Sequence, residues 1–138
     1  MLRSIRVADY MARDLVTLSP EMSVEQAIGV LLDRRISGAP VVADGRLVGV
    51  FSEVDCLREL LHAGYHDMSS GQVQNFMSTE IETIGADESI VTVAEIFLNH
   101  KRRRLPVVDS AGALVGQISR RDVLRAISDI RSGKRTAA

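Results

Sequence analysis

Apolar residues recur at helical spacing in two separate stretches of the chain. The first has the spacing i, i+3, i+4, i+7, i+8 and consists of Val24, Ala27, Ile28, Leu31 and Leu32. The second has the same spacing and consists of Ile90, Val93, Ala94, Phe97 and Leu98. Ser23 directly precedes the first stretch, and Gln26 three residues later completes the pattern of a capping box. The pattern predicts two amphipathic helices, one after Ser23 and one after Ser89.

Short runs rich in β-branched residues surround these helices and predict strands. Residues 39–43 and 46–52 form two such runs, and Asp44-Gly45 between them is typical of a two-residue hairpin turn. In the second half of the chain, a longer loop at residues 109–113 joins the equivalent pair of runs. A short strand is also predicted ahead of each amphipathic helix, at residues 15–18 and 81–84.

A further helix is predicted after each hairpin, at residues 52–63 and 119–130. The apolar positions expected to face the core are Cys56, Leu57 and Leu60 in the first helix and Val123, Leu124 and Ile127 in the second. Each half of the chain therefore has the predicted order β-α-β-β-α.

The two halves are copies of one another in a nearly constant register. Met11 matches Met77 at an offset of 66 residues, and Asp55 matches Asp122 at an offset of 67 after one inserted residue. A register held with a single insertion indicates an internal repeat.

The repeat sets the predicted domain organisation and fold class. One repeat alone has a small core and a half-bare sheet, so two repeats are expected to cover each other's apolar faces. We predict an α+β (mixed α/β) fold in which two β-α-β-β-α repeats pack as a pseudo-two-fold pair. The predicted boundaries are residues 7–63 and 73–130 for the repeats, 64–72 for a linker and 131–138 for a flexible tail.

Composition narrows the class of protein. The chain has 138 residues, of which 46% are hydrophobic and 25% are charged, as expected of a globular chain. Cys56 is the only cysteine, which excludes an internal disulfide and favours a reducing compartment, so we expect a cytoplasmic protein. No apolar run is long enough to span a bilayer, so no membrane insertion is expected.

Neither charge nor motifs predict nucleic-acid binding or catalysis. The formal net charge is −1, and the basic run at residues 101–104 has no interleaved aromatic residues. No Ser-His-Asp, Cys-His or glycine-rich phosphate-loop pattern is present, so we expect neither an enzyme nor a catalytic cofactor. His62 and His66, with Asp67 beside the latter, lack a third ligand at metal spacing, so no metal site is expected.

Two Ser-x-x-Asp turns stand out because each has two interpretations. Ser52 with Asp55, and Ser119 with Asp122, match the pattern of a helix cap whose acid complements the helix dipole. The same exposed helix start is also suited to phosphate, and an aspartate in its first turn can accept two hydroxyls of a ribose, much as an acidic side chain does in dinucleotide folds. The two roles are compatible.

The basic run at residues 101–104 also has alternative interpretations. Cations are favourable at a helix C-terminus, so the run is explained as a solvated helix end. Its arginines also suit bidentate recognition of phosphate. The matching positions in the first repeat are Ser37 and Gly38, which carry no charge, so the two repeats should not offer equivalent phosphate sites.

The sequence resembles a tandem CBS-domain pair, also called a Bateman module, over residues 7–130. The resemblance is carried by Pro-Val-Val at residues 40–42 and 106–108 and by two glycine-containing turns. The turns are Gly49-Val50-Phe51-Ser52-Glu53-Val54-Asp55 and Gly116-Gln117-Ile118-Ser119-Arg120-Arg121-Asp122. The resemblance implies a regulatory module that binds AMP, ADP, ATP or S-adenosylmethionine in clefts between its two repeats.

The resemblance also implies which residues line the clefts. One cleft would use Ser52, Asp55, Glu82, Arg102, Arg103 and Arg104. The other would use Val16, Ile36, Ser37, Ala39, Ser119 and Asp122, with Arg120 and Arg121 within reach of phosphate. The first set carries more positive charge, so we expect a nucleotide with several phosphates to prefer it.

Such modules commonly pair into a flat disc of four repeats, so we expect a homodimer. The module is expected to act in trans on an unknown partner protein. The alternative is a structural, homo-oligomerising interaction protein whose clefts stay unoccupied. Ligand-dependent thermal stabilisation distinguishes the two hypotheses.

Overall fold

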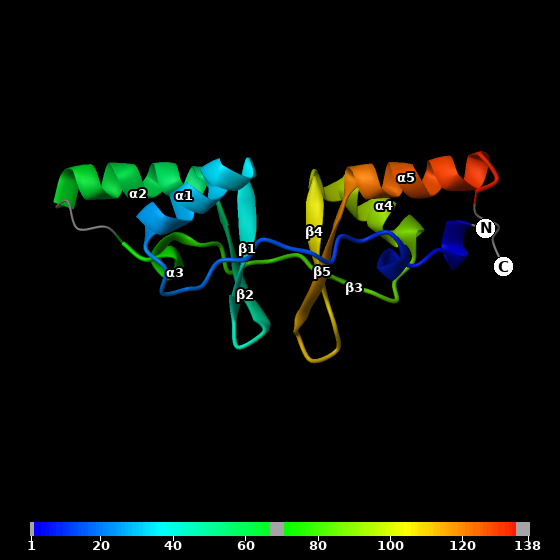
Figure 1. Cartoon of the computed structure of the whole chain (residues 1–138), viewed down its shortest axis with the longest axis horizontal. Coiled ribbons are helices and arrows are strands. Elements are labelled where there is room, and N and C mark those ends of the chain that lie inside the picture. Colours follow the sequence, from blue (N-terminus) through cyan, green and yellow to red (C-terminus); the bar gives the residue numbers. More distant parts are fainter. Residues whose placement is uncertain (1, 67–70, 135–138) are drawn as a thin grey trace. The chain divides into compact units, whose positions relative to one another are not determined.

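The computed structural model describes residues 2–66 and 71–134, with side chains for residues 2–62 and 71–134 (Figure 1). The short 3-10 helices are η1 (Leu2–Ser4) and η2 (Val7–Asp9). The α-helices are α1 (Val24–Arg34), α2 (Glu53–His66), α3 (Val73–Phe76), α4 (Ile90–His100) and α5 (Arg120–Arg131). The strands are β1 (Gly38–Ala43), β2 (Arg46–Ser52), β3 (Ile84–Gly85), β4 (Arg104–Val108) and β5 (Leu114–Ser119). Parts of the predicted linker and tail, and Asp67, lie outside the described residues.

Helices and strands mix within two compact units, which confirms the predicted α+β class. One unit is continuous in sequence, Val16–Ile81, and is here called the continuous unit. The other combines Met1–Leu15 with Glu82–Ala138 and is called the split unit. The compact units therefore differ from the sequence repeats, because the first residues of each repeat belong to the unit that contains the hairpin of the other repeat.

Two glycines allow this exchange of segments. A Cβ atom on Gly49 of β2 would lie 2.5 Å from the Sδ atom of Met77, and one on Gly116 of β5 would lie 2.6 Å from the Sδ atom of Met11. Only a residue without a side chain admits so close an approach. Backbone pairing follows the same exchange, since Ala12 pairs with Gln117 of β5.

The hairpins form where the sequence predicts them. Strands β1 and β2 pair antiparallel in the continuous unit, and β4 pairs antiparallel with β5 in the split unit. Asp44 and Gly45 have φ angles of 53° and 78°, which are the two left-handed conformations of a type I′ turn. The Asp-Gly pair is therefore explained by its conformation, because glycine and aspartate tolerate positive φ better than other residues do.

The predicted strands ahead of the amphipathic helices are much shorter than expected. In place of a strand at residues 15–18, Leu18 alone makes a parallel bridge to Val41. Leu18 donates to the carbonyl of Pro40 and accepts from the N–H of Val42. Pro40 has no N–H to pair with the residues before Leu18, and Pro20 has none to extend the ladder beyond it. In place of residues 81–84, the split unit has β3 (Ile84–Gly85), which pairs parallel with β4.

Local capping explains where the amphipathic helices begin. The Oγ atom of Ser23 accepts a hydrogen bond of 3.0 Å from the N–H of Gln26, whose side chain accepts one of 3.1 Å from the N–H of Ser23. The predicted capping box is thus confirmed. Ser89 caps α4 through a 3.1 Å bond that its Oγ accepts from the N–H of Val91.

The predicted core face of α2 and α5 was wrong in part. Val123 is buried and Cys56 and Ile127 are half-buried, but Leu57, Leu60 and Leu124 are 61%, 64% and 62% exposed. The apolar surface of these helices is wider than the face that their own unit covers. In α5, Val123 and Ala126 supply the buried face, which leaves Leu124 outside it. The spacing of apolar residues identifies an apolar helix face, but it does not say which part of the protein, if any, packs against that face.

Each unit has its own aliphatic core. In the split unit, Ile5 and Val7 from the first residues of the chain are fully buried together with Val107 of β4 and Ile118 of β5. In the continuous unit, Val73 of α3 is buried with Val41 of β1 and Phe51 of β2. The exchanged segments are therefore part of the cores that position the residues described next.

Candidate functional site

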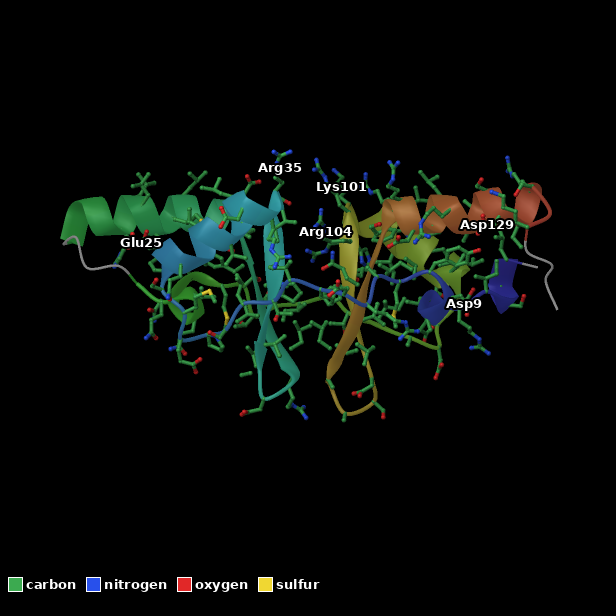
Figure 2. All side chains as sticks on the ribbon, in the orientation of Figure 1. Asp9, Glu25, Arg35, Lys101, Arg104 and Asp129 are labelled. Carbon is green, nitrogen blue, oxygen red and sulfur yellow. The ribbon has the colours of Figure 1, made fainter. Side chains whose placement is uncertain are left out.

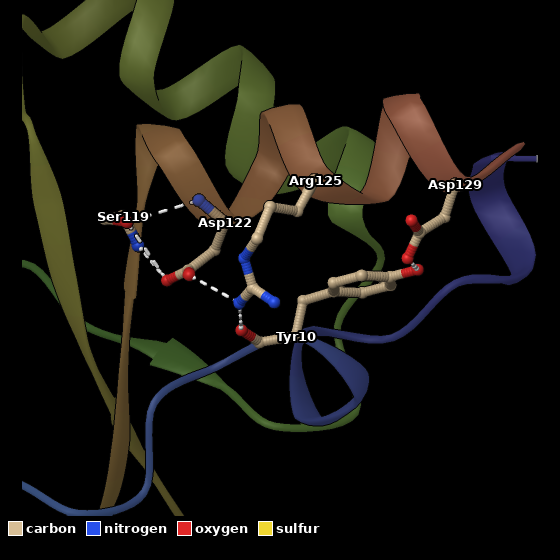
Figure 3. Close-up of polar contacts among 5 residues, drawn as sticks. All are labelled: Tyr10, Ser119, Asp122, Arg125 and Asp129. Carbon is tan, nitrogen blue, oxygen red and sulfur yellow. Dashed lines mark hydrogen bonds and ion pairs between the residues drawn. The ribbon is translucent and has the colours of Figure 1, made fainter. Parts of the chain in front are cut away.

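The Ser-x-x-Asp turn formed by Ser119 and Asp122 lies at the start of α5 (Figure 3). The Oδ2 atom of Asp122 accepts hydrogen bonds from the backbone N–H of Ser119 at 2.9 Å and from its hydroxyl at 3.0 Å. The hydroxyl oxygen of Ser119 in turn accepts a 3.2 Å bond from the N–H of Asp122. The turn is therefore a reciprocal cap, as one of the two interpretations of the sequence predicts.

The turn formed by Ser52 and Asp55, at the start of α2, has two of these three hydrogen bonds. The Oδ2 atom of Asp55 accepts bonds from the N–H of Ser52 at 2.8 Å and from its hydroxyl at 3.1 Å. Asp55 is 4% exposed and is the only buried charged residue among those that the structure describes. A buried carboxylate needs hydrogen-bond partners, and this cap supplies two of them.

An arginine three residues after each aspartate completes both turns. A guanidinium nitrogen of Arg58 donates to Oδ1 of Asp55 at 2.9 Å, and one of Arg125 donates to Oδ1 of Asp122 at 2.8 Å. Neither arginine is among the residues predicted from the sequence. The available signal was the repeated pattern Ser-x-x-Asp-x-x-Arg, which places the acid and the base on one helix face.

The segment before each Pro-Val-Val strand lies beside the start of the second helix of the same unit. In the split unit, the N–H of Arg120 donates to the carbonyl of Arg103 at 3.1 Å, and its Nε donates to the carbonyl of Arg102 at 2.9 Å. In the continuous unit, the N–H of Glu53 donates to the carbonyl of Ser37 at 2.9 Å. Each unit thus joins its Ser-x-x-Asp turn to its own pre-proline segment.

These two equivalent edges differ in charge, as the sequence predicts. The edge of the split unit carries five exposed arginines, here called the basic edge: Arg102, Arg103, Arg104, Arg120 and Arg121. Figure 2 labels Lys101 and Arg104 where β4 begins. Among the described residues, the guanidinium groups of Arg103, Arg104 and Arg121 have no hydrogen bond or ion pair. They are therefore available to an anion.

Glu82 lies at one end of the basic edge and contacts two basic side chains. Its Oε1 atom accepts a 3.3 Å bond from Nε of Arg102, and its Oε2 atom contacts Nδ1 of His100. The structure therefore brings together Glu82 and Arg102, which the resemblance assigned to one cleft. His100 joins them, and this contact offsets part of the positive charge at that end of the edge.

The remaining predicted residues lie in the continuous unit. Val16 and Ile36 are half-buried, Ser37 is exposed, and Ala39 is buried at the second position of β1. Of these four residues, Ser37 is hydrogen-bonded to the start of α2, because its carbonyl accepts from the N–H of Glu53. The predicted groupings that combine residues of the two units, such as Asp55 with Arg103, stay predictions.

Cys56 follows Asp55 directly and lies half-buried on α2. Burial raises the pKa of its thiol above the ordinary value, and the negative charge of Asp55 raises it further. A raised pKa keeps the sulfur in the thiol form, which is a weak nucleophile. Its chemistry is therefore that of a small apolar side chain.

Neither a metal cluster nor a membrane helix is found in the described part of the chain. No three His, Cys, Asp or Glu side chains described by the structure are grouped so as to hold a metal ion. Of the predicted pair His62 and His66, the second has a side chain outside the description. No described helix combines the length and apolar character needed to cross a bilayer.

Comparison with known families identifies the repeats. The model of the CBS domain matches residues 7–62 and 73–129. The two matches cover most of the chain, and each includes one Ser-x-x-Asp-x-x-Arg turn. The chain therefore belongs to the CBS-domain family and contains two CBS domains.

Curated relatives match over nearly the whole of this chain but over less of their own length. The chloroplastic CBS domain-containing protein CBSX1 of Arabidopsis thaliana is 33% identical, over 95% of this chain and 68% of the relative. An inosine-5′-monophosphate dehydrogenase of Korarchaeum cryptofilum is 30% identical over 86% of this chain, but the match spans only 23% of the dehydrogenase.

Solved structures of CBS pairs share the fold. The crystal structure of CBSX2 in complex with AMP has a TM-score of 0.80 and 31% identity, covering 91% of this chain and 98% of that one. The structure of the CBS-pair protein CBSX2 from Arabidopsis thaliana has a TM-score of 0.77 and 30% identity, covering 92% and 96%. The fold predicted from the resemblance is thereby confirmed.

Proposed function

We propose that this chain is a regulatory module that binds an adenosine nucleotide. The observation that carries the proposal is the duplicated Ser-x-x-Asp turn, in one copy of which a basic edge lies beside the aspartate. A carboxylate can accept ribose hydroxyls, as an acidic side chain does in dinucleotide-binding folds, and free guanidinium groups bind phosphate. The 31% identity to CBSX2, which has been crystallised with AMP, supports AMP as the first ligand to test.

The proposal gives each predicted residue a role. Asp55 with Ser52, and Asp122 with Ser119, hold ribose. Phosphate is held by the free guanidinium groups of Arg103, Arg104 and Arg121, with Arg102 fixed by Glu82. Apolar contact with the purine comes from Val16, Ile36 and Ala39, and Ser37 offers a hydroxyl beside them.

Thermal unfolding with AMP, ADP, ATP and S-adenosylmethionine tests nucleotide binding. A ligand present at about 100 times its dissociation constant stabilises the folded state by about 2.7 kcal/mol, which raises the Tm by several degrees. An unchanged Tm with all four compounds contradicts the proposal. It would favour the alternative, a structural interaction protein whose sites stay empty.

Removing two free arginines tests the phosphate role. The double variant Arg103→Ala, Arg104→Ala should bind ATP and ADP about tenfold or more weakly, because it loses two charge-assisted contacts. Isothermal titration calorimetry measures the change. A matched control is Arg46→Ala, Arg131→Ala, which removes the same charge from exposed positions outside the proposed site. Equal affinities for the two double variants contradict the phosphate role.

A homodimer is the second part of the proposal, and exposed apolar side chains on α2 support it. Val54, Leu57 and Leu61 follow the spacing i, i+3, i+7 and are all more than half exposed. A solvent-facing apolar stripe of this kind is typical of a protein–protein contact. We infer that a second copy of the chain covers it, and that the resulting assembly acts in trans on a separate partner protein, without catalysis of its own.

The variant Leu57→Glu tests the homodimer, because it places a charge in the centre of the stripe. Sedimentation equilibrium should show a dimer for the unchanged chain and a monomer for the variant. Glu59→Gln, on the same helix but outside the stripe, should leave the dimer intact. A monomer for the unchanged chain at tens of micromolar contradicts the homodimer.

A further inference from the structure

Helix α5 holds the first residues of the split unit by polar contacts that the nucleotide proposal does not use (Figure 3). The hydroxyl of Tyr10 donates to Oδ2 of Asp129 at 2.7 Å, across 119 residues of sequence. A guanidinium nitrogen of Arg125 donates to the carbonyl of Tyr10 at 3.0 Å. The Cζ atom of Arg125 also lies 5.7 Å from the centre of the Tyr10 ring, in cation–π range.

The same nitrogen of Arg125 is bound to the proposed ribose acceptor. The Nη2 atom of Arg125 donates to Oδ1 of Asp122 at 2.8 Å as well as to the carbonyl of Tyr10. A guanidinium NH2 group has two hydrogens, and each is engaged by one of these acceptors. Arg125 therefore joins Asp122 directly to the segment that contains Tyr10, through a single nitrogen atom.

The hydrogen-bond capacity of Asp122 makes this connection responsive to a ligand. A carboxylate has about four lone-pair positions. Ser119 occupies two of them, both on Oδ2, and Arg125 occupies one on Oδ1. One position is left, whereas a ribose offers two adjacent hydroxyl donors. If Asp122 accepts both hydroxyls, one of the three existing bonds has to be given up.

Of these three bonds, the one from Arg125 is given up most easily. The N–H of Ser119 is fixed by the backbone, and its hydroxyl belongs to the reciprocal cap of α5. The side chain of Arg125 is 57% exposed, so water can solvate the guanidinium once it moves away.

We propose that a ribose bound at Asp122 displaces Arg125 and thereby loosens the hold of α5 on the segment around Tyr10. This inference rests on the proposed function, since it requires a nucleoside at Asp122. The segment runs directly into Val16, the first residue of the continuous unit. Occupancy of the site is in this way converted into a local change at the chain connection between the two units.

The continuous unit provides a natural comparison, because its equivalent turn is built without this link. At the position of Tyr10 it has Phe76, and at the position of Asp129 it has His62, whose ring packs edge-on against Phe76. Arg58 donates to Asp55 as Arg125 does to Asp122, but no hydrogen bond among the described residues joins Arg58 to α3. Release of Arg58 is therefore not expected to loosen α3.

Amide hydrogen exchange with and without AMP, followed by NMR, tests the coupling. Saturating AMP should speed exchange of the Tyr10 and Met11 amides about fivefold, because a charge-assisted bond that holds their segment is lost. The amides of Val7 and Ala8 should keep their protection, since they donate to Glu88 and Ala86. The amide of Met77, at the equivalent place in the continuous unit, should not speed up.

Variants separate the coupling from simple destabilisation. Arg125→Ala should speed exchange at Tyr10 and Met11 without ligand, and AMP should then add little. The matched variant Arg58→Ala should leave these two amides unchanged. Tyr10→Phe keeps the aromatic ring and removes only the bond to Asp129, so it serves if Arg125→Ala does not fold. If AMP loosens the segment, then a variant that already loosens it should bind AMP more tightly, by thermodynamic reciprocity. Tyr10→Phe should therefore tighten AMP binding about threefold.

Calorimetry in the same samples distinguishes the two ways of failing. Measurable AMP binding together with unchanged or slower exchange at Tyr10 and Met11 overturns the coupling and leaves the proposed function standing. No heat of binding with AMP, ADP, ATP or S-adenosylmethionine overturns the proposed function and the coupling with it. Faster exchange at Tyr10 and Met11 only in the presence of AMP supports both.

Discussion

Asp55 and Asp122 each have a structural role in the structure and, in our proposal, a ligand-binding role as well. Each closes the cap of its helix through Oδ2, and each leaves an acceptor position on Oδ1. The sequence identified these aspartates and their serines, because a cap depends on residues only three positions apart. It did not identify Arg58 and Arg125, because an i, i+3 ion pair is common on helix surfaces and carries no functional signal by itself.

Cys56 gives a prediction at the scale of a single residue. Because burial and the charge of Asp55 raise the pKa of its thiol, the reactive thiolate is scarcer at pH 8 in the folded protein than in the unfolded one. Alkylation by iodoacetamide should therefore be slower in buffer than in concentrated urea, as followed by mass spectrometry. Equal rates in the two solvents contradict this expectation. Glu53→Gln removes another nearby negative charge and should speed the reaction in buffer.

At the scale of elements, a sequence prediction was correct where the feature depends on neighbouring residues. It failed where the feature depends on residues that are distant along the chain. The capping box at Ser23 and the Asp44-Gly45 turn depend on neighbouring residues and were predicted correctly. The strand at residues 15–18 depends on partners in β1, and it shrank to one bridge. Which side of α2 is exposed depends on the elements that pack against the helix. Leu57 was therefore predicted to face the core but is exposed.

Two glycines give opposite predictions at this scale. Gly29 lies inside α1 and has nothing within 4 Å of the point that a Cβ atom would occupy, so Gly29→Ala should stabilise the protein by about 0.5–1 kcal/mol. Gly116 faces Met11 and the carbonyl of Ala12, which would lie 2.9 Å from a Cβ atom, so Gly116→Ala should destabilise by about 1–3 kcal/mol. Urea denaturation measures both, and the same sign for the two variants contradicts the packing argument.

At the scale of the whole molecule, the exchange of first segments is the main organising feature. The sequence repeats begin at Val7 and Val73, but Met11 packs on Gly116 and Met77 packs on Gly49. Each compact unit is therefore completed by residues from the other repeat. Each repeat therefore depends on the other to complete the core of its unit, whether or not a ligand is bound.

The exchange predicts which unit a core variant will loosen. Ile5 is 1% exposed in the core of the split unit, so Ile5→Ala should destabilise it by about 2–5 kcal/mol and speed amide exchange at Val107 and Ile118. The amides of Val41 and Phe51 should be less affected. The matched variant Val73→Ala should have the reverse pattern, because Val73 lies in the continuous core. Loosening of Val41 by Ile5→Ala would contradict the exchange.

The sequence by itself determined the repeat, the order of the hairpins and the long helices, the caps and the charge difference between the two edges. All of these depend on residues close together in the chain or on a register that can be read by comparison of the two halves. Only the tertiary structure decided that the first segments are exchanged and that Arg125 links Asp122 to Tyr10. In the split unit these features join residues more than 100 positions apart, such as Tyr10 and Arg125. Side-chain packing and hydrogen bonding choose such partners only when the chain is folded.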